Sequence, residues 1–106
     1  MKNKTFLKVK ITFYGDVSKK EEVKYFALVS NAIEYATSRK WMDVEITQTN
    51  FCETMEKLRK IWQSQTQHLS NEKAIERIDD ESYQTNAGKL FDIKIRFEAL
   101  KFEDSF

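Results

Sequence analysis

The sequence predicts an α+β domain folded as a two-layer sandwich, with a three- or four-stranded mixed sheet and two helices on one face. Residues 5–14 and 89–100 alternate apolar and polar side chains, as half-buried strands do. Residues 19–38 and 50–69 repeat apolar side chains at the spacing of amphipathic helices. A chain of 106 residues can bury one core, so we expect a single domain over residues 1–106.

The first strand, TFLKVKITFY, is expected to face the core with every second residue: Leu7, Val9, Ile11 and Phe13. A helix over about residues 19–38 follows, because Ser18 and Glu21 have the spacing of a capping box. Its apolar residues recur at helical spacing: Phe26, Val29, Ile33 and Ala36. A further set widens that stripe on one flank: Tyr25, Leu28, Ala32 and Tyr35.

The run WMDVEIT at residues 41–47 predicts a second strand, with Met42, Val44 and Ile46 on one face. Asn50 is expected to cap a second helix, since Glu53 follows at capping-box distance. A narrow apolar stripe predicts that this helix buries one side: Phe51, Met55, Leu58, Trp62 and Leu69.

Residues 70–88 fit two descriptions. A short helix would bury Ala74, Ile75 and Ile78, whereas an irregular strand would end at Tyr83. The sequence QTNAG is typical of a hairpin turn, so a strand or loop is favoured over a helix. The last strand, KLFDIKIRFEAL, is expected to direct four side chains inward: Phe91, Ile93, Ile95 and Phe97. Residues 103–106 are expected to form a tail.

The expected order is therefore strand, helix, strand, helix, a strand or short helix, strand. Right-handed strand–helix–strand crossovers would place both helices on one face of the sheet, in a broadly ferredoxin-like arrangement. The other face would then carry no helix and could bind a partner.

Composition excludes several functional classes. Charge is balanced, with 18 basic and 17 acidic residues, which is unusual for a protein held to nucleic acid mainly by charge. The chain has no proline and two glycines, which argues against a glycine-rich phosphate loop. One cysteine excludes an internal disulfide and fits a reducing compartment. Because no signal peptide or membrane-spanning run is visible, we expect a cytoplasmic protein.

The sheet face without helices is one candidate binding surface. Its expected basic and aromatic residues could hold phosphates and stack bases: Phe6, Lys8, Lys10, Tyr14, Lys94 and Arg96. The same face is also expected to receive Asp92 and Glu98 from the last strand and Asp43 and Glu45 from the second. In a parallel strand pair, Asp43 and Glu45 would lie near Lys8 and Lys10 and neutralise them. A solvated or partner-covered face is therefore favoured over a nucleic-acid site.

The flank of the first helix is the other candidate surface. Four aromatic or aliphatic residues are expected at its exposed edge or on the second strand: Tyr25, Leu28, Tyr35 and Trp41. Exposed residues of these types are enriched in protein interfaces, although they also cover the rim of small cores. They are the predicted protein-interaction residues.

No catalytic or metal-binding constellation is predicted. Cys52 has no second cysteine beside it and is expected to be a buried structural thiol. His68 stands alone near the end of a helix, and Asp79, Asp80 and Glu81 lack the ligand spacing of a calcium loop. We expect no enzyme activity, no metal and no cofactor.

The expected function is protein binding, as an adaptor or inhibitor, with a homodimer as one form of that association. Small domains without catalytic motifs are typical of the accessory proteins with which phages and mobile elements redirect host machinery. The alternative is a module that binds single-stranded nucleic acid on the open sheet face.

Overall fold

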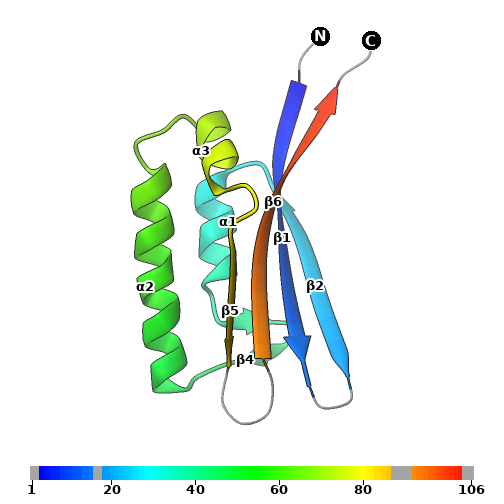
Figure 1. The fold of residues 1–106 in the computed structure, drawn as a ribbon, viewed down its shortest axis with the longest axis vertical. Coiled ribbons are helices and arrows are strands. Elements are labelled where there is room, and N and C mark those ends of the chain that lie inside the picture. Colours follow the sequence, from blue (N-terminus) through cyan, green and yellow to red (C-terminus); the bar gives the residue numbers. More distant parts are fainter. Residues whose placement is uncertain (1–2, 16–17, 87–91, 104–106) are drawn as a thin grey trace.

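A computed structural model describes residues 3–15, 18–86 and 92–103, and the side chains of 5–15, 18–85 and 92–101. The fold is an α+β sandwich in which a four-stranded sheet lies against a layer of helices (Figure 1). The elements, in chain order, are β1 (Asn3–Tyr14), β2 (Lys19–Phe26), α1 (Val29–Ala36), β3 (Lys40–Trp41), β4 (Val44–Glu45), α2 (Thr49–Thr66), α3 (Asn71–Ile78), β5 (Ser82–Asn86) and β6 (Asp92–Glu103).

The predicted fold class is confirmed, and the strand arrangement differs from the expected one. The four strands lie in the order β2-β1-β6-β5, and each neighbouring pair is antiparallel rather than mixed. All the helices of the described chain lie between β2 and β5 in sequence and on one side of the sheet (Figure 1). Antiparallel pairs of consecutive strands, β1 with β2 and β5 with β6, thus replace the expected strand–helix–strand crossovers.

The two long strands β1 and β6 form the centre of the sheet, as their alternation predicted. They pair along their full lengths, from Asn3 opposite Glu103 to Tyr14 opposite Asp92. The predicted inward residues are buried: Leu7, Val9, Ile11, Phe13, Ile93, Ile95 and Phe97. Phe91, which was also expected to face inward, lies outside the described residues.

The helix expected over residues 19–38 is wrong in its first half. Residues 19–26 form strand β2, which pairs with β1, and helix α1 begins only at Val29. The backbone N–H of Gly15 donates to the carbonyl of Ser18 (2.8 Å), which closes a hairpin where a helix cap was expected. The predicted helical spacing of apolar residues is confirmed from Val29 onward, where Val29, Ile33 and Ala36 of α1 are buried.

Helix α1 obtains its N-terminal cap from a residue far away in sequence. Leu28, at the N-cap position, makes no side-chain cap. Instead, the Asn71 side chain accepts from the Val29 N–H (3.0 Å) and donates to the Ala27 carbonyl (2.6 Å). This amide therefore joins the start of α3 to the start of α1 and satisfies a backbone donor that a helix leaves unpaired.

The strand expected at residues 41–47 is wrong as a member of the main sheet. β3 and β4, each two residues long, form a separate hairpin. Met42 and Asp43 between them adopt positive φ angles (52° and 63°). This turn breaks the alternation, so Trp41 points into the core while Val44 is exposed. Ile46 is buried as predicted.

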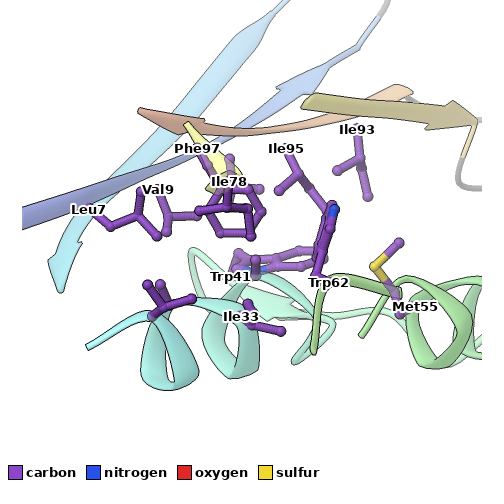
Figure 2. Close-up of a cluster of buried hydrophobic side chains, with 14 of the residues drawn as sticks. Leu7, Val9, Ile33, Trp41, Met55, Trp62, Ile78, Ile93, Ile95 and Phe97 are labelled. Carbon is purple, nitrogen blue, oxygen red and sulfur yellow. The ribbon is translucent and has the colours of Figure 1, made fainter. Parts of the chain in front are cut away.

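Helix α2 confirms the predicted one-sided stripe. Phe51, Met55 and Trp62 are buried, and Leu58 and Leu69 pack against the core with part of their surface exposed. The helix begins at Thr49 after Gln48, which makes no side-chain cap, so the cap predicted at Asn50 is wrong. Figure 2 shows Trp62 reaching toward the sheet, and its ring packs edge-on against Phe97 with centroids 4.8 Å apart.

The ambiguous segment contains both a helix and a strand. Ser70 caps α3 by accepting from the Lys73 N–H (3.4 Å), and Ala74, Ile75 and Ile78 are buried as a helix there would require. β5 follows this helix and pairs antiparallel with β6, so the strand that was favoured for this segment exists after the helix and not in place of it. Glu103, expected to begin the tail, is instead the last residue of β6. Residues 87–88 of the expected turn and residues 104–106 of the expected tail lie outside the described residues.

Candidate functional site

The side of the sheet that points away from the helices is the open face, and strand alternation assigns its residues. Figure 1 shows α1, α2 and α3 together on the opposite side. The register of the strands places the following described side chains on the open face: Phe6, Lys8, Lys10, Thr12 and Tyr14 of β1, Lys19, Glu21, Val23 and Tyr25 of β2, Ser82 and Gln84 of β5, and Asp92, Lys94, Arg96, Glu98 and Leu100 of β6.

The predicted basic residues of the open face are together, but Asp43 and Glu45 are not their acidic partners. Lys8 pairs with Glu98 (Nζ–Oε2 3.7 Å) and Lys10 with Glu21 (Nζ–Oε2 3.0 Å). The expected partners, Asp43 and Glu45, lie at the β3–β4 hairpin outside this sheet. That prediction is therefore wrong, because it assumed that residues 41–47 pair with β1.

Glu21 is the acidic centre of these pairs. It lies within 4.0 Å of Lys19 as well as close to Lys10. The hydrogen bond from the Lys10 ammonium, helped by the positive charge of both lysines, holds the pKa of Glu21 below its usual value. The side chain is exposed, so this arrangement affects the local charge of the face far more than the stability of the fold.

Like charges also meet on the open face. Lys10 lies directly opposite Arg96 in the β1–β6 register. Arg96 forms an ion pair with Asp80, which lies in the turn just before β5 (Nη2–Oδ1 3.3 Å). No described acid pairs with Lys94. In the middle of the face, Lys10 and Arg96 thus each have an acidic partner at the side, whereas Lys94 has none among the described residues.

The apolar residues of the open face gather at one end. Phe6 lies directly opposite Leu100, and Tyr25 lies opposite Lys8, which makes Phe6 and Tyr25 diagonal neighbours. We call Phe6, Tyr25 and Leu100 the apolar corner. Phe6 and Leu100 are partly exposed, and Tyr25 leaves 61% of its surface accessible, more than any other large apolar residue described.

Tyr14 lies at the opposite end of the open face from the apolar corner, and 38% of its surface is exposed. The Lys19 ammonium lies 5.8 Å from the centre of its ring. Thr12, between the two ends, is only 3% exposed, so its neighbours cover the middle of the face.

The four predicted protein-interaction residues do not form one surface. Tyr25 and Leu28 are exposed, but Tyr25 belongs to the open face and Leu28 to the turn before α1. Trp41 is 1% exposed, packed edge-on between Phe13 and Phe51. Its expected exposure is therefore wrong, and the cause is the positive-φ turn that follows it.

Tyr35 is the fourth of these residues, and it links α1 to the strand β2. Its hydroxyl donates to the carboxylate of Glu22, its ring packs on Phe26 (5.4 Å), and the Lys24 ammonium lies 5.0 Å from the ring centre. Burial and the hydrogen bond to Glu22 raise the pKa of Tyr35 well above its usual value. The residue is half-buried and mainly structural.

Cys52 and His68 do not come together with other reactive groups. Cys52 is partly buried in the first turn of α2, where its sulfur accepts from the Arg39 guanidinium (2.7 Å) and lies 3.9 Å from the carbonyl of Ile46. The contact ties the loop before β3 to α2. His68 is exposed just beyond the end of α2.

The acidic run Asp79, Asp80 and Glu81 continues the pairing along β6. The Asp79 side chain accepts from the Ala99 N–H (2.7 Å), while backbone groups of Asp80 and Glu81 bond to both backbone groups of Phe97. These roles explain the run as a turn. Within the part of the chain that is described, no three His, Cys, Asp or Glu side chains gather as they would around a metal ion.

The structure also contains a cavity that sequence patterns did not indicate. It has a volume of about 410 Å³ and lies where α1, α2 and α3 meet. Its lining is mixed: Val29, Ser30, Ile33, Gln63, Thr66, Gln67, Leu69, Asn71 and Ala74. The spacing of Gln63 and Gln67, one helical turn apart, is the only sequence signal for it, and exposed glutamines on a helix are ordinary.

No helix among the described residues has the length and apolar character needed to cross a membrane. Comparisons with protein-family models, with curated proteins and with solved structures found no significant match to this chain.

Proposed function

We propose that the protein acts without catalysis, by binding another protein as an adaptor or inhibitor, and that the apolar corner of the open face makes the contact. The observation that carries the proposal is Tyr25, a residue 61% exposed on a sheet face over which no described helix lies. Tyrosine supplies a large, rigid contact area and is enriched among the residues that dominate binding energy at interfaces.

The charges around the apolar corner support a protein partner. Lys8, beside Tyr25, is paired with Glu98, and Lys10 is paired with Glu21. Cations that already have acidic partners release fewer counterions when they meet a phosphate backbone, so they contribute less to nucleic-acid affinity. A polar rim of paired charges around apolar residues is the usual composition of a protein interface.

The reactive side chains also favour binding over catalysis. The sulfur of Cys52 contacts an arginine and a backbone carbonyl, and His68 lies exposed beyond α2. In the described chain, no hydrogen bond joins either residue to a carboxylate or to another imidazole that could act as a general base.

Single-stranded nucleic acid is the second candidate ligand, and one observation favours it. Lys10 and Arg96 lie directly opposite each other, with Lys94 on the same strand as Arg96 and without an acidic partner in the described chain. Like charges facing each other across a strand pair are unfavourable, and a bound phosphate would add to the partial neutralisation that Glu21 and Asp80 already provide. Tyr14 and Phe6 would offer ring faces on either side of this basic centre.

The test of the protein-binding proposal uses Tyr25→Ala with Ile61→Ala as the matched control. Ile61 has similar exposure (49%) but lies on α2, in the layer opposite the open face. Immobilised protein is incubated with native lysate, with nuclease added to half of each sample. We expect a protein that wild type and Ile61→Ala capture despite nuclease, and that Tyr25→Ala binds about tenfold or more weakly. Capture that is unchanged by Tyr25→Ala would contradict the proposal.

Nucleic-acid binding is tested with single-stranded DNA and RNA oligonucleotides at two salt concentrations. Lys10→Glu with Arg96→Glu should abolish retention, while Lys57→Glu with Lys60→Glu makes the same change of charge on the exposed side of α2 and should retain it. Wild-type protein without salt-sensitive retention would remove this candidate.

A further inference from the structure

Strand β2 presents an unpaired edge. It lies at the end of the strand order β2-β1-β6-β5, so one side bonds to β1 and no described strand lies on the other. Figure 1 shows β2 as the outermost strand on its side of the sheet. Its backbone N–H and C=O groups on that side are available to pair with another strand.

The side chains of β2 have a fixed orientation relative to the two layers. Glu22 lies opposite Ile11 and Lys24 opposite Val9, so both are on the helix side, and their contacts with Tyr35 of α1 agree with this placement. Val23 lies opposite Lys10 on the open face. Charged edge strands generally resist pairing with other edges. The order of charges along β2 nevertheless permits one pairing.

Two copies can pair their β2 edges antiparallel around a two-fold axis perpendicular to the sheet. Such an axis keeps both helix layers on one side, and directly opposed residues must then belong to the same face. With Val23 opposite Val23 of the second copy, residues 20–26 of both copies overlap. Glu22 then lies opposite Lys24 of the second copy, and the symmetry repeats this pair.

Neighbouring registers lack this complementarity. Sliding one copy by two residues in one direction places Glu22 opposite Glu22 and Lys20 opposite Lys24 of the second copy. Sliding it in the other direction places Lys24 opposite Lys24. Like charges directly opposite each other are destabilising. The register centred on Val23 is therefore the one that the charge order of β2 selects.

We propose that the protein forms a symmetric dimer by pairing the β2 edges of two copies in this register. The two four-stranded sheets become one eight-stranded sheet, and their open faces become continuous across the axis. In that sheet each Tyr25 lies opposite Glu21 of the second copy, beside the central pair of Val23 side chains. The dimer uses the sheet edge and not the apolar corner alone, so it can fail while the proposed function holds.

The test exchanges the two charges. Glu22→Lys places lysines opposite each other, Lys24→Glu places glutamates opposite each other, and the double variant restores two attractive pairs in reverse. Sedimentation equilibrium should show wild type and the double variant at twice the 12.6 kDa mass of one chain. Each single variant should raise the dimer dissociation constant about tenfold or more.

Mixing the two single variants tests directly whether residues 22 and 24 face each other across the dimer. The Glu22→Lys chain carries two lysines and the Lys24→Glu chain two glutamates, so an equimolar mixture should form a heterodimer although neither chain dimerises alone. Each single variant loses a different contact with Tyr35, so shared instability of α1 would not be repaired by mixing. The matched control is Lys20→Glu, whose side chain would face Phe26 of the second copy, and it should still dimerise.

Several outcomes overturn the proposal. A wild-type protein that stays monomeric at all concentrations would do so. Dimers that persist equally in both single variants would place the contact elsewhere. A mixture of the two single variants that remains monomeric would exclude this register. None of these substitutions changes Tyr25, Phe6 or Leu100, so capture of another protein by the apolar corner can be measured on the same variants and decides the proposed function separately.

Discussion

The two faces of the sheet are built from the same four strands and are stabilised in opposite ways. The covered face packs apolar side chains of β1 and β6, such as Ile11 and Phe97, against the helices until no surface remains exposed. The open face carries lysines and acids whose ion pairs are solvated and contribute little to folding. Substitutions on the covered face should therefore change folding, whereas those on the open face should change binding.

Phe97→Ala should give the largest loss of stability. Phe97 is fully buried and packs edge-on against Trp62, so its removal leaves a cavity between β6 and α2. We expect the free energy of unfolding to fall by about 3–5 kcal/mol. The control on the open face of the same strand, Lys94→Ala, should change it by about 0.5 kcal/mol or less. Equal losses in urea titrations of the two variants would contradict the comparison.

Asn71→Ala should give a smaller loss on the covered side. The substitution leaves the Val29 N–H and the Ala27 carbonyl without the partner that now caps α1. We expect a loss of about 1–2 kcal/mol in the free energy of unfolding. Asn31→Ala, on the exposed side of α1, is the control and should be neutral or slightly stabilising. Hydrogen exchange should also show faster opening of the first turn of α1 in Asn71→Ala.

Tyr35→Phe should remove a contact worth up to about 1 kcal/mol, the hydrogen bond to Glu22. The pKa of Tyr35 is raised in the folded protein, so folding favours the protonated phenol. This contribution is complete below the unfolded-state pKa of about 10 and is lost as pH rises above it. In denaturant titrations from pH 8 to 11, wild type should lose more stability than Tyr35→Phe. Parallel curves would show that Tyr35 does not contribute.

Substitutions at Glu21 should have the smallest effect on folding. Its lowered pKa means that its contribution is present above the unfolded-state pKa and is lost as pH falls through the folded-state value. In an NMR titration of the carboxyl carbons, Lys10→Gln should return the pKa of Glu21 toward its ordinary value. Added salt should do the same in wild type. If the pKa of Glu21 stays the same after the Lys10→Gln substitution and after salt is added, Lys10 is not its partner.

The sequence predicted the regions in which a regular apolar repeat meets a single buried surface. The strands β1 and β6 and the helix α2 satisfy that condition, since each has one side against the core and a long run in which to express its period. The burial of Leu7, Val9 and Ile11 follows directly from their alternation. The exposure of Leu28 agrees with its predicted position at the edge of the apolar stripe, whereas Tyr35, expected to reach solvent, is half-buried.

The regions that were missed depend on contacts between distant segments. β2 is an edge strand whose residues Lys19–Phe26 are mostly charged, so its apolar period is too weak to distinguish it from the helix that follows. The cap of α1 comes from Asn71, and no pattern near Val29 indicates it. Trp41 faces the core because two positive-φ residues reverse the chain after it. The preference for Asp43 and Glu45 as partners of Lys8 and Lys10 was wrong because ion pairs on a sheet depend on which strands are neighbours.

The pairing of β1 with β6 also determines the order in which the fold can form during synthesis. One edge of β1 can pair early with β2, which follows it closely in sequence, whereas the other edge pairs with β6, which is made much later. Until β6 emerges from the ribosome, β1 is an edge strand, and Val9 and Ile11 on its core face lack the neighbouring side chains of β6. Long-range pairings of this kind slow folding and leave intermediates exposed to aggregation. The core face of β1 should therefore stay only partly packed for as long as β6 is missing.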